Sequence, residues 1–258
     1  CYQLRPAPGS SWASRLASPK IGWFFGWLSF WYLAIGVVAM DNALASQALM
    51  PLAGMAEDED VARVITLVVL VIQAVLVIAS TRLLALFTSG AVAVELAIVA
   101  ILILVLAAVM VFSGSGHPGN LVSEGVAAGA PDYWAIGGGV MAAMVIGLTT
   151  LVGFDSAANL AEEAKDPFRS VPRAIVGSVV AAAVLGLVFL IVLTTAIEDL
   201  RAVTADGSPV AAIIREQLGP VAERILLACI VFAMFGAGMV VMAACARHVF
   251  AMSRDRRF

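Results

Sequence analysis

Three acidic residues lie inside long apolar stretches of this sequence, and they are the side chains best able to do chemistry. They are Asp41, Glu95 and Asp155, and no Lys or Arg lies at a comparable depth in those stretches. An unpaired carboxylate in an apolar interior is costly, so it is expected to be protonated, to bind a cation or to face a water-filled path. These residues therefore indicate proton or cation binding, with Asp155 as the first candidate and Glu95 as the second.

Two of the acids also have a structural interpretation. Asp41 is displaced outward from the middle of its apolar stretch and could reach the outer interface. Glu95 is nearest the middle of its own stretch and could hydrogen-bond to a neighbouring helix. Asp155 is the strongest candidate for function because of the glycines that precede it.

Those glycines predict a break in the helix that carries Asp155. The stretch 133–164 has about 32 residues, which at 1.5 Å per residue is too long for one straight membrane crossing. A break near Thr150–Gly153 would leave carbonyls free at the end of one half-helix and amides free at the start of the next. These groups could hold the ammonium and carboxylate of a small solute. The alternative is that the glycines only allow close helix packing.

Composition identifies the elements that must position these residues. The chain is 62% hydrophobic and 13% charged, with a mean hydropathy of +1.02, which is typical of a polytopic membrane protein. Continuous apolar runs argue against the alternating strands of a β-barrel. We expect an all-α fold in a single transmembrane domain over 1–258, with a discontinuous fourth span. Six stretches are long enough to cross a bilayer: 21–49, 61–80, 83–113, 133–164, 174–197 and 222–253.

The distribution of Lys and Arg predicts the topology. With the N-terminus inside, eleven of these residues fall on inner segments and four on outer ones, so both ends of the chain are expected in the cytoplasm. We expect a multi-pass protein of a bacterial plasma membrane. The net charge of −3 gives no sign of nucleic-acid binding. Because the chain begins at Cys1 and stops at Phe258 just after a charged segment, we expect it to be a piece of a longer protein.

The sequence gives little support to an enzyme, a metal site or a cofactor site. It has no CxxC or HExxH motif, and the predicted topology puts His117 and His248 on opposite sides of the membrane. We expect no catalytic residue, no metal and no cofactor. An intramembrane hydrolase would need Asp41 or Glu95 to share a site with Asp155, since an aspartyl dyad has two carboxylates. A non-transporting partner or scaffold protein is the other alternative.

Three motifs resemble a known family. One is Gly153–Ala157, followed by Ala161–Pro167 and Val171–Ile175. The second is Ser11–Leu16 leading to Gly22–Leu28, and the third is Ala246–Asp255. In this order they are similar to the sixth helix, the entry of the third and the end of the eighth in the amino acid–polyamine–organocation permeases of the amino acid/choline type. The six spans would then correspond to helices three to eight of about twelve.

The resemblance implies two inverted five-helix repeats, with the substrate held where the first and sixth helices unwind. The sixth-helix break would run from Thr149 to Asp155, with the backbone of Thr150, Leu151 and Val152 facing the substrate amine. Asp155 matches a position of proton coupling in relatives. Thr149, Thr150 and Leu151 stand where many members have an aromatic gate, so this chain departs from the family there.

Further residues complete the predicted binding site and gates. Gly153 and Phe154 belong to the same break, and Gly238 and Met242 of the last span border the site. Ser208, Pro209 and Gly219 predict a short extracellular helix over 209–218, which the resemblance makes a lid. The inner loop 162–173 is either a solvated charged loop or a cytoplasmic gate that includes Glu162 and Arg169.

These predictions combine into one function. We expect secondary active transport of an amino acid or a related amine, by proton symport or exchange with alternating access. The expected partners are the small-molecule substrate, a coupling proton and the lipid bilayer.

Overall fold

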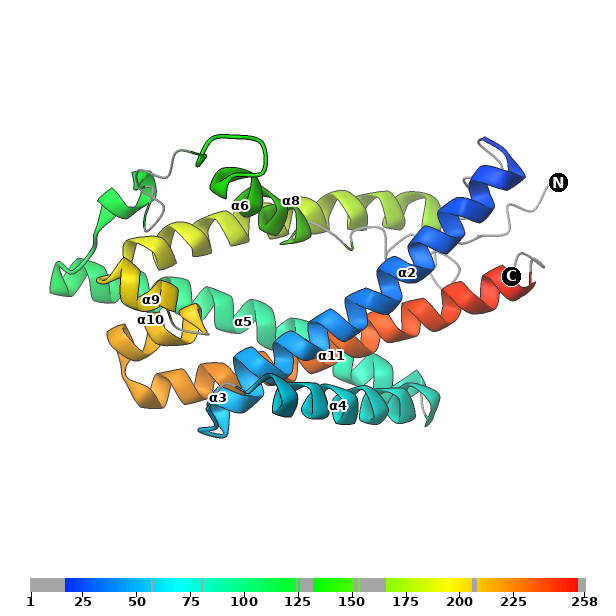
Figure 1. The fold of residues 1–258 in the computed structure, drawn as a ribbon, viewed down its shortest axis with the longest axis horizontal. Helices are drawn as coiled ribbons and strands as arrows, with labels where there is room; N and C mark the ends of the chain where they lie inside the picture. Colours follow the sequence, from blue (N-terminus) through cyan, green and yellow to red (C-terminus); the bar gives the residue numbers. More distant parts are fainter. Residues whose placement is uncertain are drawn as a thin grey trace. The chain divides into compact units, whose positions relative to one another are not determined.

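The structure is a computed structural model, and the regular secondary structure in the part of the chain that it describes consists of helices, without strands (Figure 1). The described residues are 17–56, 58–79, 81–123, 125, 132–150, 153, 166–205 and 208–254. Five helices among them are long and apolar enough to cross a membrane. The predicted all-α membrane fold is confirmed.

The chain divides into two compact units. Unit 1 consists of Cys1–Val94, Asp155–Ala174 and Ile230–Phe258, and unit 2 consists of Glu95–Phe154 and Ile175–Cys229. Three helices continue from one unit into the other: α5 at Thr81–Ser113, α8 at Pro167–Thr195 and α11 at Pro220–Arg254.

Unit 1 begins with a long helical run that ends at Leu52. The run consists of α2 at Pro19–Leu44, the π-helix η1 at Ala45–Leu49 and α3 at Met50–Leu52. Ser18 caps the start, because its side chain accepts a hydrogen bond from the Ile21 amide at 3.3 Å and Pro19 follows it. Helix α4 then covers Glu59–Ala79.

Acidic residues fix the start of α4. The Asp58 carboxylate accepts hydrogen bonds from the amides of Asp60 at 2.9 Å and Val61 at 3.2 Å. Arg63 forms ion pairs of 2.7 Å with both Glu59 and Asp60. This exposed cluster holds three charges of the helix together at its start, where acidic side chains also match the helix dipole.

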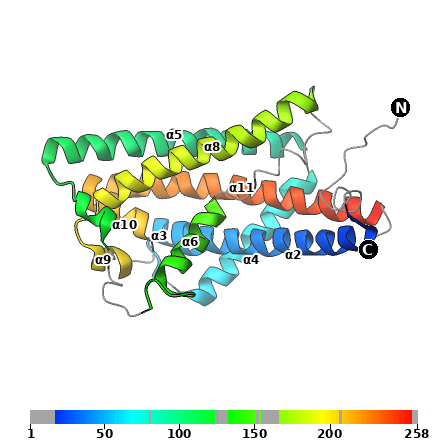
Figure 2. The same ribbon diagram turned by 90° about the horizontal axis from the view of Figure 1, so that it is seen from above.

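The helices of unit 1 pack closely at several points. Helix α2 packs against α4 (Figure 2), and the His248 ring of α11 donates through Nε2 to the Gly26 carbonyl of α2 at 3.0 Å. The rings of Phe87 on α5 and Phe235 on α11 lie 6.3 Å apart. Beside them Gly236 approaches Ala91 so closely that a Cβ atom would not fit.

Unit 2 is organised around the end of α8, which covers Pro167–Thr195. The Asn120 side-chain amide donates to the carbonyls of Thr194 at 3.2 Å and Ile197 at 2.9 Å. Gln217 donates to the Ala196 carbonyl at 2.9 Å. These bonds satisfy carbonyls that the end of a helix leaves free.

Four shorter elements complete unit 2. Asn120 belongs to the 3₁₀ turn η2 and Gln217 to α10, whose Ala211, Ile213 and Ile214 are buried. Helix α10 packs against α9 and ends at Gly219, where φ is +86°. The bounds are Pro118–Val122 for η2, Gly139–Thr150 for α6, Leu200–Ala205 for α9 and Pro209–Leu218 for α10.

The helices differ from the predicted spans in two places. Helix α8 begins at Pro167 rather than at 174 and includes Pro172. Pro172 is the sixth residue of α8, and the helix continues through it although the proline has no N–H to bond the Phe168 carbonyl. Within the predicted fourth span the structure describes α6, of 12 residues, while 151, 152 and 154–165 lie outside the described residues.

Candidate functional site

A buried polar contact in unit 1 joins three helices through one glutamine. Gln73 of α4 donates from Nε2 to Asp41 Oδ1 of α2 at 2.9 Å and to the Phe235 carbonyl of α11 at 3.3 Å. Asp41 and Gln73 are both 0% exposed. We call Asp41, Gln73, the Phe235 carbonyl and Gly238 the Asp41 cluster.

The Asp41 cluster has more hydrogen-bond acceptors than donors among the described residues. A side-chain amide has two N–H groups, and those of Gln73 are both used. Asp41 Oδ2 and Gln73 Oε1 are buried and have no partner among the described residues. Turning the amide over would not help, because Oε1 would then face two other acceptors. Two unsatisfied acceptors in one buried site call for an explanation.

Gly238 closes the cluster on the side of α11. A Cβ atom built there would lie 2.5 Å from Gln73 Nε2 and 2.8 Å from Asp41 Oδ1. Real Cβ atoms do not approach polar side chains so closely, so only glycine fits while Gln73 keeps its two bonds. The absence of a side chain at Gly238 therefore allows α11 to pack against the polar pair.

The helix that carries Asp41 changes its geometry directly after it. The π-helix Ala45–Leu49 begins four residues beyond Asp41, and Ser46 Oγ donates to the Asn42 carbonyl at 2.9 Å. Short π-helical segments inside α-helices are frequent at functional sites. Ala45 and Ala48 are fully buried, so the irregular turn lies in the packed interior with the cluster.

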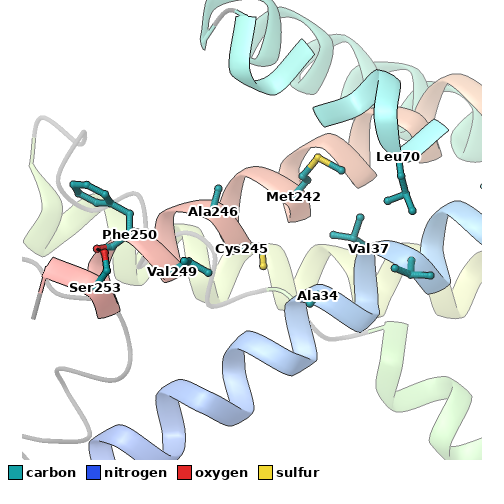
Figure 3. Close-up of a pocket in the computed structure, with 10 residues that line it drawn as sticks. Ala34, Val37, Leu70, Met242, Cys245, Ala246, Val249, Phe250 and Ser253 are labelled. Atoms are coloured by element: carbon teal, nitrogen blue, oxygen red, sulfur yellow. Dashed lines mark hydrogen bonds between the residues drawn. The ribbon is translucent and has the colours of Figure 1, made fainter. Parts of the chain in front are cut away.

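An apolar groove of about 640 Å³ lies one helical turn from the cluster on each of the three helices (Figure 3). Val37 lies four residues before Asp41, Leu70 three residues before Gln73, and Met242 four residues after Gly238. From there the groove follows α11 past Cys245 to Ser253. Met242 was predicted to border the binding site together with Gly238; the structure puts Met242 in this groove and Gly238 in the cluster.

The two predicted acids that the structure describes differ in their exposure. Asp41 does not reach an interface, because its carboxylate is fully buried against Gln73, so that alternative is wrong. Glu95 on α5 is exposed. Within the described part of the chain, no carboxylate hydrogen-bonds to Asp41, so its partner there is an amide and not the second acid of an aspartyl dyad.

Sequence reasoning missed Gln73. The residue stands alone in an apolar helix, and no motif marks it. Its signal is that an amide in the middle of a membrane span needs a polar partner, because the lipid interior offers none. Asp41 is the acid able to supply that partner across α2 and α4.

The predicted break after α6 is described in part. Thr149 and Thr150 are the last residues of α6, and Gly153 has φ +94°, which favours glycine. The break itself stays a prediction, because 151, 152 and 154–165 lie outside the described residues. Of the other predicted site residues, Arg169 is exposed in the first turn of α8. Leu151, Val152, Phe154, Asp155 and Glu162 lie outside the described residues.

Comparison with known proteins identifies relatives of almost the whole chain. The amino acid permease family matches residues 9–258. A branched-chain amino acid permease of Lactococcus lactis subsp. cremoris (strain MG1363) is 25% identical over 269 residues, which cover 98% of this chain and 56% of the relative. The chain thus spans about half the length of that curated relative. No solved structure matches it.

Proposed function

Because this chain belongs to the amino acid permease family, we propose that the protein carries amino acids or related amines across a bacterial plasma membrane. The observation that carries the proposal is the family match over residues 9–258. The helices long enough to span a bilayer and the name of the Lactococcus relative support it. The proposed mechanism is proton symport or exchange with alternating access, in which the substrate site opens to one side of the membrane at a time.

The proposed substrate site is the end of α6. The last four carbonyls of an α-helix have no partner within the helix, so a helix that ends inside the membrane presents them to a ligand. The described part of α6 extends to Thr150, and the positive φ of Gly153 turns the backbone away from a helical course. We assign the backbone of 150–152 to the substrate ammonium, with Thr149, Gly153 and Phe154 around it. Substrate recognition through backbone carbonyls would accept any α-amino acid.

The proposed coupling acid is Asp155, with Glu95 second. Asp155 directly follows the break, so a change in its charge would act on the half-helix that contacts the substrate. Arg169 and Glu162 are proposed to form a cytoplasmic gate, and α10 a lid on the outer side. This arrangement rests on the predicted topology, in which both ends of the chain are cytoplasmic.

Uptake by the whole protein in proteoliposomes tests this function. A panel of labelled amino acids is offered with and without an inward proton gradient, to the wild type and to Asp155→Asn. We expect saturable uptake of at least one amino acid, stimulated by the gradient in the wild type and not in the variant. Gradient-independent uptake in both would remove the proton-coupling part and leave an exchanger. No uptake of any amino acid or amine would contradict the proposal.

A further inference from the structure

We propose that the Asp41 cluster is a buried proton-binding site in which Asp41 Oδ2 carries a proton at neutral pH. Asp41 is not one of the proposed coupling acids, which are Asp155 and Glu95, and its proposed role goes beyond the proposed function because it does not require that the protein transports anything. The proton comes from water and returns to it, and no bond other than O–H forms or breaks.

The first reason to place a proton on Asp41 is the pattern of hydrogen bonds in the cluster. The Asp41–Gln73 pair already shares one N–H···O bond, from Nε2 to Oδ1 at 2.9 Å. Its two remaining oxygens, Oδ2 and Oε1, are buried and have no donor among the described residues. A carboxylic acid and an amide can pair through two antiparallel bonds, N–H···O and O–H···O. One proton on Oδ2 supplies the donor for the second bond and satisfies both oxygens.

The second reason is that the neighbouring helices offer no nearby positive charge to balance an ionised Asp41. Glu59, Asp60 and Arg63 are the charged residues at the start of α4, and they pair with one another. The nearest of them along the helix, Arg63, is ten residues from Gln73, or about 15 Å. A counter-charge for an ionised Asp41 is thus not supplied from α4.

The other packed elements give the same result. On α11, Cys245, Arg247 and His248 follow Gly238 by seven to ten residues, or about 10–15 Å along the axis. His248 hydrogen-bonds to the Gly26 carbonyl. Lys20 lies at the far end of α2, and η1 contains no titratable residue. Of the two charged residues of α5, Glu95 is exposed, and the side chain of Arg82 lies outside what the structure describes. Among the described side chains, an ionised Asp41 would therefore be a buried charge without a neighbouring cation, which is strongly unfavourable.

The described side chains favour a proton over a metal ion. On the side of α11, Gly238 leaves no room for one more carbon beside Gln73 Nε2 and Asp41 Oδ1. In the described part of the chain, no group of three or more His, Cys, Asp or Glu side chains could hold a metal ion. The groove is lined by neither Asp41 nor Gln73. A proton needs no volume of its own and only one acceptor, which Gln73 Oε1 provides.

Infrared spectroscopy of the whole protein in lipid tests this assignment. A protonated carboxyl group has a C=O stretch that a carboxylate lacks. We expect a wild-type band at neutral pH that disappears in Asp41→Asn and persists in Asp155→Asn and in Glu95→Gln. Gln73→Leu should shift the band to higher frequency, because the carboxyl group loses its hydrogen-bond partner. The spectra are recorded in sodium and in sodium-free buffer.

Each outcome decides the assignment. No band lost in Asp41→Asn at neutral pH would overturn it, since Asp41 would then be ionised. A band that appears only without sodium would replace the proton by a sodium ion, and a band unchanged in Gln73→Leu would remove Gln73 as the partner. If Asp41→Asn does not fold, ¹³C-aspartate labelling of Asp155→Asn gives the test instead. The band must shift on labelling, because an aspartate other than Asp155 then carries it. A protein that transports nothing can still show the band, so a failure of the transport proposal can be told apart from a failure of the proton assignment.

Discussion

Adding one methyl group at Gly238 should destabilise unit 1, because that position lies against the Asp41 cluster. In Gly238→Ala the new Cβ would lie 2.5 Å from Gln73 Nε2 and 2.8 Å from Asp41 Oδ1. Gln73 cannot move aside freely, since Nε2 is bonded to both Asp41 and the Phe235 carbonyl. Either α11 shifts away from α2 and α4, or Gln73 gives up at least one of its bonds.

The expected magnitude follows from these two costs. Inserting a methyl group into a packed interior costs about 1–3 kcal/mol, and leaving a buried polar group unsatisfied costs a similar amount. Alanine regains up to about 1 kcal/mol over glycine inside a helix. We expect a net loss of about 2 kcal/mol in the free energy of unfolding, or about 5 °C in melting temperature.

Thermal unfolding of the detergent-solubilised whole protein measures this loss. Gly36→Ala is the matched control, because Gly36 lies on α2 in the same unit and a Cβ there would meet nothing within 4 Å. We expect the control to melt at or slightly above the wild-type temperature. If both variants melt at the same temperature, the close packing of α11 against Asp41 and Gln73 is refuted.

Three further substitutions have defined outcomes. Gly153→Ala should lower the melting temperature, because φ +94° costs a residue with a Cβ about 1–2 kcal/mol, whereas Gly147→Ala in α6 should not; equal melting would argue against the turn. Asn120→Ala should leave the carbonyls of Thr194 and Ile197 without their side-chain donor and speed hydrogen exchange of the His117 amide, which donates to the Thr195 carbonyl. Ser123→Ala is the control. If the His117 amide exchanges at the same rate in both variants, Asn120 does not hold this turn. His248→Phe keeps a ring but loses the bond to Gly26, so we expect a loss of about 1 kcal/mol by the same melting assay, and an unchanged melting temperature would count against that contact.

The fold class could be predicted from the sequence because it depends on local properties. Continuous apolar runs identify membrane helices without any knowledge of their partners. The predicted helix bounds were less accurate near proline, because proline can either precede a helix or lie within one. The predicted fifth span begins at 174, after Pro172, yet α8 begins at Pro167 and includes this proline.

The Asp41 cluster could not be predicted from the sequence because its members are far apart in the chain. Asp41 and Gln73 are on different helices, and Gly238 belongs to a third. The estimate that Asp41 could reach the outer interface used its position along one helix, while its burial depends on which face α4 and α11 cover. Gln73 alone suggests no chemistry, and its meaning comes only from the acid beside it.

Counterflow transport tests the central claim, amino acid transport by this family member, most directly. Proteoliposomes that contain the whole protein are loaded with one unlabelled amino acid from a panel and diluted into the same amino acid in labelled form, with no ion gradient, so the result does not depend on the coupling mechanism. The claim predicts that at least one labelled amino acid transiently accumulates above its equilibrium level. No counterflow with any amino acid or amine would contradict it.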